Sequence, residues 1–285
     1  MGNLLLSERY SRSLTLKAPN LKPMKVSPKK ALGQHFLTDP SICYDIAHAL
    51  SKLDEVKTIV EVGPGTGALT KELIPLNKDL QLFEVDLESV AYLNEFFPEG
   101  AFTVHTKDFL KVKLDEYIDG KFVLIGNYPY NISSQILFKA FDYKDLIPEV
   151  VGMFQKEVAE RVASGPGTKK YGILSVLLQA FYDIEYLFTV GPEKFDPPPK
   201  VDSGVIRMVR NNVLELPCSL PFFIRTVKLA FNQRRKTLRN SLKSLEGDVP
   251  ETFAQRRPEQ MSVGDFIELA AHFEELAIDK TKDDE

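Results

Sequence analysis

Short apolar runs alternate with helical patterns over residues 58–209, and this alternation constrains the fold more than any other feature of the sequence. Apolar runs suited to strands occupy residues 58–62, 80–85, 102–105, 122–125, 150–154, 184–190 and 201–209. Patterns suited to helices occupy residues 41–53, 68–76, 87–97, 134–141 and 173–181. Strands interleaved with helices predict βαβ units and an α/β fold with a mostly parallel sheet. A proline-rich loop joins the last two strands, which predicts an antiparallel strand near the end of the sheet.

The composition changes after Arg210, where a linker-like stretch is followed only by helical patterns. These patterns lie at residues 222–229, 238–245 and 263–276. About 70 residues are enough for a small domain. We therefore predict an N-terminal extension at residues 1–28, an α/β domain at residues 29–210 and a small all-α domain at residues 211–285.

Charge is distributed unevenly along a chain whose 285 residues carry a net charge of −4. Residues 225–243 hold seven Lys and Arg and no acidic residue. A basic face of this kind can bind phosphate even on an acidic protein, although a solvated helix face is the alternative. The two cysteines form no disulfide or zinc pattern, and no apolar run is long enough to cross a membrane. We expect a cytoplasmic protein without a metal or a membrane anchor.

A glycine-rich loop, Gly-Pro-Gly-Thr-Gly at residues 63–67, follows a predicted strand and opens a predicted helix. Gly63 and Gly65 allow a tight turn and the close approach of a ligand to the backbone. With Ala68 the loop meets the loose dinucleotide-binding pattern, and an acidic residue, Glu84, follows at the expected spacing. Its carboxylate can accept hydrogen bonds from the ribose hydroxyls of an adenosine, which both NAD and S-adenosylmethionine contain.

Two further acids favour S-adenosylmethionine over NAD. Glu61 precedes the glycine loop, where a negative charge suits a cationic cofactor and does nothing for a pyrophosphate. Asp108 follows the third predicted strand and can accept the exocyclic amine of the cofactor adenine, although a turn cap is its commoner role. These residues and the strand order predict a Rossmann-like, class I S-adenosylmethionine-dependent methyltransferase.

The apolar run 122–125 leads into Asn127-Tyr128-Pro129-Tyr130, an unusual way to end a strand. In a doubly wound sheet, ligands bind outside the carboxyl ends of the strands, so this loop faces the same cleft as Glu84. The Asn127 side-chain oxygen and the Pro129 carbonyl can each accept one N–H of an adenine amine, and Tyr130 offers a ring for the base to stack on. The motif therefore indicates methylation of an exocyclic adenine amine, with a plain surface turn as the alternative.

A stiff loop at residues 195–203, Phe-Asp-Pro-Pro-Pro-Lys-Val-Asp-Ser, is the third informative stretch. Three prolines extend the backbone, and Phe195 stands at its start. A second ring here would close the other face of a bound base. The alternative is a rigid linker to the last strand, with Phe195 in the core.

Six stretches in this order resemble the ribosomal RNA adenine N6,N6-dimethyltransferases. They are residues 33–37 (GQHFL), 61–67 (EVGPGTG), 83–86 (FEVD), 127–133 (NYPYNIS), 195–203 (FDPPPKVDS) and 231–239 (FNQRRKTLR). The resemblance extends from about Lys29 to beyond Leu269, nearly the whole chain. One departure is Tyr128, since the family most often has leucine at this position. There the backbone contributes more than the ring, so we expect activity to survive.

The resemblance implies transfer of four methyl groups from S-adenosylmethionine to two adjacent adenines near the 3′ end of small-subunit rRNA, late in subunit assembly. It further implies that a monomer acts on the small ribosomal subunit. The implied cofactor contacts are His35, Leu37, Gly63, Gly65, Glu84, Asp108 and Asn127. The implied rRNA contacts are Arg234, Arg235, Lys236 and Arg239.

Three alternatives remain beside this reading. The methylase that modifies large-subunit rRNA has the same catalytic core, but the stretch 231–239 fits the small-subunit enzymes better. A non-catalytic assembly factor could keep the fold, although intact Glu84, Asn127 and Tyr130 argue against lost chemistry. NAD-dependent oxidoreduction is disfavoured because the sequence offers no obvious hydride-site His or Lys.

Overall fold

The computed structural model describes residues 26–283, so most of the predicted N-terminal extension lies outside the described residues. The strands are β1 (Phe36–Leu37), β2 (Thr58–Val62), β3 (Asp79–Phe83), β4 (Thr103–His105), β5 (Phe122–Asn127), β6 (Glu149–Gln155), β7 (Tyr182–Val190), β8 (Phe195–Asp196) and β9 (Ser203–Arg210). The helices are α2 (Pro40–His48), α3 (Thr70–Leu73), α4 (Leu87–Phe96), α5 (Ser133–Asp142), α6 (Lys156–Ala163), α7 (Ile173–Gln179), α8 (Leu220–Asn232), α9 (Leu238–Ser241), α10 (Glu251–Ala254) and α11 (Val263–Asp283). No helix of this part of the chain is long and apolar enough to span a membrane.

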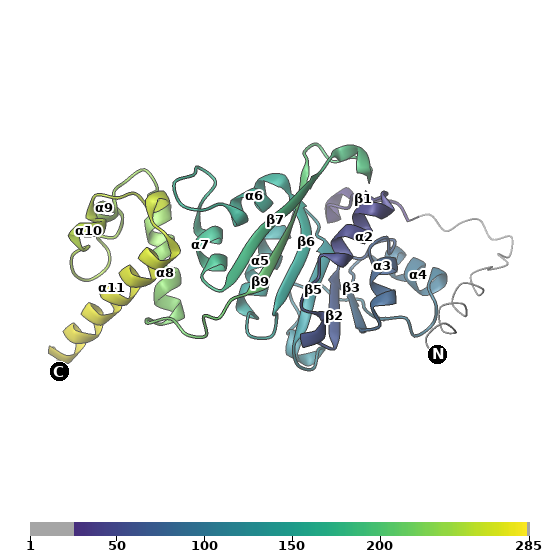
Figure 1. Cartoon of the computed structure of the whole chain (residues 1–285), viewed down its shortest axis with the longest axis horizontal. Helices are drawn as coiled ribbons and strands as arrows, with labels where there is room; N and C mark the ends of the chain where they lie inside the picture. The colour runs from purple at the N-terminus through teal and green to yellow at the C-terminus, as the bar shows by residue number, and fades with distance from the viewer. Residues whose placement is uncertain (1–25, 284–285) are drawn as a thin grey trace, which may run out of the picture.

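Seven strands form the central sheet, in the order β4-β3-β2-β5-β6-β9-β7 (Figure 1). The first five are parallel, and β9 runs antiparallel to both β6 and β7. The predicted mostly parallel sheet with one antiparallel strand near its end is therefore confirmed. Because β5 lies next to β2 in the middle of the sheet, the loops that follow them emerge side by side at the carboxyl edge.

Helices cover both faces of the sheet, and each face has its own hydrophobic cluster. On β5 the side chains alternate: Phe122 and Leu124 belong to one cluster, Val123 and Ile125 to the other. This explains a continuous apolar run, since successive side chains of a strand point to opposite faces. Residues of α2, α3 and α4 line one cluster, and residues of α5, α6 and α7 line the other.

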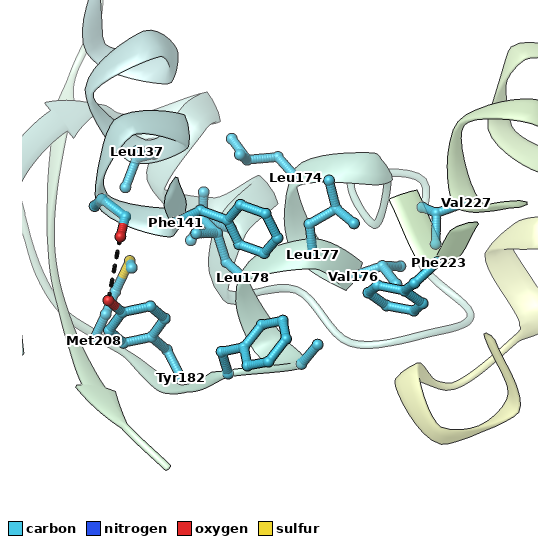
Figure 2. Close-up of a cluster of buried hydrophobic side chains, with 14 of the residues drawn as sticks. Leu137, Phe141, Leu174, Val176, Leu177, Leu178, Tyr182, Met208, Phe223 and Val227 are labelled. Carbon is cyan, nitrogen blue, oxygen red and sulfur yellow. Dashed lines mark hydrogen bonds between the residues drawn. The ribbon is translucent and has the colours of Figure 1, made fainter. Parts of the chain in front are cut away.

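The helices α8–α11 gather at one end of the molecule, beyond α7 and the β7 edge (Figure 1). Figure 2 shows Val176 and Leu177 of α7 beside Phe223 and Val227 of α8. These side chains belong to the same cluster as the sheet face that α5 covers. The predicted division of the chain at Arg210 stays a prediction, and the hydrophobic core itself is continuous across it.

Several short elements were not predicted, among them α6, α10, β1 and β8. Helix α6 follows β6 directly, and the pair β1–β8 joins segments about 160 residues apart, with Leu37 opposite Phe195. Two-residue strands leave no periodic pattern, so only the folded chain reveals this pairing. Element ends also shift: β3 ends at Phe83 instead of residue 85, and β5 extends to Asn127 instead of residue 125.

Candidate active site

A cavity of about 190 Å³ lies at the carboxyl edge of the sheet. The segments that follow β2, β3, β4 and β5 line it, and residues 32–37 of the N-terminal segment complete its wall. Five sequence regions therefore meet where a doubly wound sheet binds its ligands. All predicted cofactor contacts line this cavity, namely His35, Leu37, Gly63, Gly65, Glu84, Asp108 and Asn127.

The glycine loop turns sharply away from β2. Gly63, Gly65 and Gly67 have φ angles of 70°, 56° and 78°, in the left-handed region that favours glycine. A Cβ atom on Gly65 would lie 2.8 Å from the Phe36 ring, and one on Gly67 would lie 2.4 Å from the Phe97 ring. The glycines thus permit both the turn and the close packing of the N-terminal segment against the loop.

Glu84 is held in place by the backbone around it. Its carboxylate accepts N–H bonds from Gly65 at 3.1 Å, Val85 at 2.8 Å and Asp86 at 2.9 Å. The side chain is buried, and burial raises its pKa while these three bonds oppose the shift. A carboxylate fixed in this way keeps lone pairs free for the hydroxyls of a ribose.

Glu61 lies in surroundings that oppose the negative charge expected of it. It is fully buried, and its carboxyl accepts a hydrogen bond from the Thr70 hydroxyl at 2.7 Å. Burial raises its pKa to about 8, with a smaller contribution from nearby Glu84. At neutral pH the carboxyl therefore holds its proton for much of the time. It lines the cavity, where a cation would favour the ionised form.

Asp108 caps a turn, and it also lies at the cavity wall. Its Oδ1 accepts the Leu110 N–H at 3.0 Å as a turn cap, and Lys111 approaches Oδ2 at 3.4 Å. The residue also lines the cavity. A contact that sequence reasoning missed holds this loop from behind: the ammonium of Lys139 on α5 donates to the carbonyls of Leu110 and Val112.

Residues 29–39, which we name the strap, run along the cavity. At one end the Lys29 ammonium pairs with Asp86, and the Gln34 amide donates to the same carboxylate at 3.2 Å. At the other end Asp39 pairs with Lys194 at 2.8 Å, next to the β1–β8 pairing. One pattern in the sequence could have indicated the Asp86 anchor: an aspartate at the start of α4, two residues after Glu84.

Asn127 has an amide whose orientation the strap determines. Its Nδ2 donates to the carbonyl oxygen of His35 at 3.1 Å. Among the described residues, none donates to its Oδ1. The amide nitrogen is therefore occupied by the protein, and the oxygen is left as an acceptor at the cavity.

The residues predicted to contact the target base differ in how far the protein already occupies their hydrogen-bonding groups. Tyr130 lines the cavity; its hydroxyl bonds Ser203 at 2.5 Å, and its ring stacks on His35 with centroids 5.4 Å apart. The Pro129 carbonyl accepts the Ile132 N–H at 3.2 Å, so one of its two lone pairs is used. The preceding carbonyl, that of Tyr128, accepts no hydrogen bond from the described residues. Both carbonyls are thus candidates for the second acceptor.

The ring of Tyr128 belongs to the core. It is 1% exposed, and its ring centroid lies 4.8 Å from that of Phe154. Its edge lies against two glycines on neighbouring strands, Gly126 and Gly152, where an added Cβ would come within 2.8 and 2.1 Å of the ring. The two glycines make room for the tyrosine ring at this position.

Phe195 does not line the cavity. It is 4% exposed and packs in the cluster of α2, α3 and α4, with Leu37 opposite it in the β1–β8 pair. The ring is therefore in the core in this structure, which was the alternative to base stacking. The physical reason is the pairing with the strap, which turns the start of the proline-rich loop inward.

The predicted rRNA contacts lie outside the cavity, on the helical end of the molecule. Arg235 and Lys236 are exposed and form no ion pair with a described residue. Arg239 pairs with Glu251, and Arg234 approaches Glu259 at 3.8 Å. The four cations are therefore not equivalent.

The cavity residues suit S-adenosylmethionine. Among the described residues that line the wall there are three carboxyl groups, those of Glu61, Glu84 and Asp108, and one cation, Lys107. These acidic side chains can accept hydrogen bonds from ribose hydroxyls and an adenine amine, and their charge suits a sulfonium and an ammonium. They offer little to a pyrophosphate, which is an anion. Within the described part of the chain, no group of His, Cys, Asp or Glu is arranged to hold a metal ion.

The fold and the cavity together define a class I S-adenosylmethionine-dependent methyltransferase. Solved structures agree. A dimethyladenosine transferase from Plasmodium falciparum is 25% identical, with a TM-score of 0.73, covering 85% of this chain and 98% of that one. The 23S rRNA methyltransferase ErmE is 24% identical, with a TM-score of 0.63, and shows the same fold over 82% of this chain and 99% of its own.

Sequence comparison identifies the family. A profile described as ribosomal RNA adenine dimethylase matches residues 26–270. The ribosomal RNA small subunit methyltransferase A of Parabacteroides distasonis is 55% identical over 248 residues, covering 86% of this chain and 93% of that protein. The protein of the same name from Bacteroides thetaiotaomicron is 54% identical over 255 residues, covering 88% and 95%. The chain belongs to the ribosomal RNA adenine dimethylase family.

Proposed function

We propose that this chain dimethylates the N6 amines of two adjacent adenines near the 3′ end of small-subunit rRNA, late in assembly of the subunit. The observation that carries the proposal is the amide of Asn127, whose nitrogen donates to His35 and whose oxygen, at the cavity, accepts no hydrogen bond from any described residue. The relatives named for methylation of the small-subunit rRNA support the choice of substrate.

S-adenosylmethionine, when bound, supplies an electrophilic methyl group on a good leaving group. Glu84 accepts the ribose hydroxyls and Asp108 the adenine amine, while His35 and Leu37 of the strap face its methionine end. The absence of side chains at Gly63 and Gly65 allows the cofactor to approach the backbone of the loop closely. The cofactor is thereby oriented by groups that are already fixed before it binds, which lowers the entropic cost of reaching the reactive geometry.

The target amine is a poor nucleophile because its lone pair is delocalised into the adenine ring. Asn127 Oδ1 accepts one of its N–H bonds, and a carbonyl of Tyr128 or Pro129 accepts the other. Two acceptors localise electron density on the nitrogen and direct its lone pair toward the methyl group. No strong general base is required, since the proton can leave after transfer.

The base must leave its stack to enter the site. Tyr130 offers one ring for the extruded base, and the hydroxyl bond to Ser203 and the His35 ring hold that tyrosine in place. Stacking of this kind contributes roughly 1–3 kcal/mol per base. Phe195 would have to leave the core before it could contribute a second ring.

The basic side chains of the helical end supply the affinity for the small ribosomal subunit. Arg234, Arg235, Lys236 and Arg239 lie on one turn and one helix start, outside the cavity. We place rRNA phosphates against this cluster, mainly at Arg235 and Lys236, because Arg234 and Arg239 already contact Glu259 and Glu251. The enzyme then acts as a monomer on small subunits in the cytoplasm.

The test is transfer of labelled methyl groups to small subunits that lack them. We expect label in the two adjacent adenines, about four methyl groups per particle. Binding without transfer would support a non-catalytic assembly factor, and label in large-subunit rRNA would support the alternative methylase.

A further inference from the structure

The loop at residues 165–170, Gly-Pro-Gly-Thr-Lys-Lys, connects α6 to α7 and is exposed along its whole length. It belongs to the sheet region of the chain, yet two contacts attach it to the helical end. The Gly167 N–H donates to the Glu259 carbonyl at 2.6 Å, and Arg234 donates to the Thr168 carbonyl at 3.1 Å. The loop therefore lies directly beside the turn that carries Arg235 and Lys236.

The loop is also held in shape from within. The Thr168 hydroxyl donates to the Gly165 carbonyl at 3.2 Å and accepts the Tyr171 N–H at 3.2 Å. Tyr171 is buried, and its ring packs edge-on against Phe231 of α8, 6.1 Å between centroids. A loop anchored at both ends presents its charges at a fixed position, so little entropy is lost when they meet a partner.

The two lysines of this loop are in different electrostatic situations. Lys170 pairs with Glu160 of α6. Lys169 is exposed and forms no ion pair with any described residue. A cation that is already paired within the protein gains less from a phosphate than an unpaired one. By the same criterion Arg235 and Lys236 are available, while Arg239 is engaged by Glu251.

We propose that Lys169 binds an rRNA phosphate together with Arg235 and Lys236, and that Arg234 is the positioning residue that holds the loop beside them. The binding surface would then span the sheet region and the helical end. This inference rests on the proposed function, because it takes the small-subunit rRNA as the polyanion. It predicts which of the clustered cations contribute to binding and which do not.

The experiment measures binding of the full chain to undermethylated small subunits at several salt concentrations. Each phosphate contact contributes roughly 0.7–0.9 to the slope of log K against log salt. Lys169→Ala should reduce that slope by this amount, and its neighbour Lys170→Ala is the matched control that should leave it unchanged. Affinity for S-adenosylmethionine should be the same in all three proteins.

The positioning role has its own readout. Arg234→Lys keeps the positive charge but cannot hold Thr168 and Glu259 at once. In that background Lys169→Ala should cause no further change in slope, since contacting residues of one network are not additive.

Equal slopes for wild type and Lys169→Ala, or equal losses for both lysine variants, would overturn the proposal. So would additive slope losses for Arg234→Lys and Lys169→Ala. If the wild type itself shows no salt-dependent binding to subunits, the proposed function fails, and not only the phosphate-binding role of Lys169.

Discussion

The cofactor cavity and the basic surface of the helical end follow opposite designs. In the cavity, the functional groups are buried or half-buried and already bonded to the protein: Glu84 to three backbone N–H groups, Asn127 to His35. On the surface, Arg235 and Lys236 are exposed and unpaired with any described residue. The cavity is preorganised for one geometry, as transition-state stabilisation requires. The surface supplies charge, as phosphate binding requires.

This difference separates the expected effects of substitutions. A change in the cavity should alter turnover or cofactor affinity and leave the salt dependence of subunit binding intact. A change on the basic surface should do the reverse.

Asn127→Ala should lower kcat by a factor on the order of 10²–10³, the usual cost of removing one hydrogen-bonding group that acts in a transition state. Single-turnover methylation of small subunits measures it. Cofactor affinity should stay within a few-fold, because Glu84 and Asp108 remain. Unchanged turnover would remove Asn127 from the mechanism.

Glu84→Gln should raise the Kd for S-adenosylmethionine by roughly 10- to 100-fold, since hydrogen bonds to a charged group contribute about 1.5–3 kcal/mol. An amide cannot accept all three backbone N–H bonds that converge on this side chain. Calorimetric titration measures the Kd.

Glu149→Gln is the matched control for Glu84→Gln. Glu149 is the first residue of β6, is fully buried and lies away from the cavity. Its carboxylate accepts N–H bonds from Ser51 and Lys52. It should lower stability without changing the Kd. If both variants lost cofactor affinity equally, the effect would be one of general destabilisation.

Replacing Arg235 and Lys236 by alanine together should reduce the salt slope of subunit binding by roughly 1.4–1.8, for two phosphate contacts. Cofactor affinity should not change. Filter binding at several salt concentrations gives the slope. A slope equal to that of the wild type would mean that Arg235 and Lys236 do not bind phosphate and are simply solvated.

Glu61→Gln should change how stability depends on pH. Burial raises the pKa of Glu61 from 4.5 to about 8, so between these values the native carboxyl keeps a proton that the unfolded chain releases. The free energy of unfolding then falls as pH rises through this window, by at most about 1.4 kcal/mol per pH unit. The amide can still accept the Thr70 hydroxyl, so the variant should lack this loss.

Urea unfolding of both proteins at pH 6, 7 and 8 measures the effect of Glu61. The stability of the variant relative to the wild type should increase over this range. A constant difference would mean that Glu61 is ionised in the native protein throughout.

Asp86→Asn should have the smallest effect. Asparagine still caps α4, but the ion pair between the buried Asp86 and the partly exposed Lys29 is lost, which removes one of the contacts that hold this end of the strap. We expect the Kd for S-adenosylmethionine to rise roughly two- to five-fold through a faster dissociation rate, measured by stopped flow. Lys52→Ala, which breaks a local surface pair with Glu55 away from the cavity, should have no effect on that rate.

The sequence was enough to predict the site residues that directly follow a strand. Glu84 and Asn127 were expected at the cavity because each follows an apolar run, and parallel strands bring their carboxyl ends to one edge. The contact of Lys29 with Asp86 was missed, since no local pattern relates residues 57 apart. Phe195 shows the same limit: whether an aromatic ring at the start of a loop is buried depends on what packs over it, here the strap.

The most direct test of the account is methyl transfer from labelled S-adenosylmethionine to small subunits whose rRNA lacks adenine methylation, compared between wild type and Asn127→Ala. We expect the wild type to place label on the N6 positions of two adjacent adenines near the 3′ end. The variant should bind both cofactor and subunit yet transfer at least about 100-fold more slowly. Label at another site, or equal rates for the two proteins, would contradict the account.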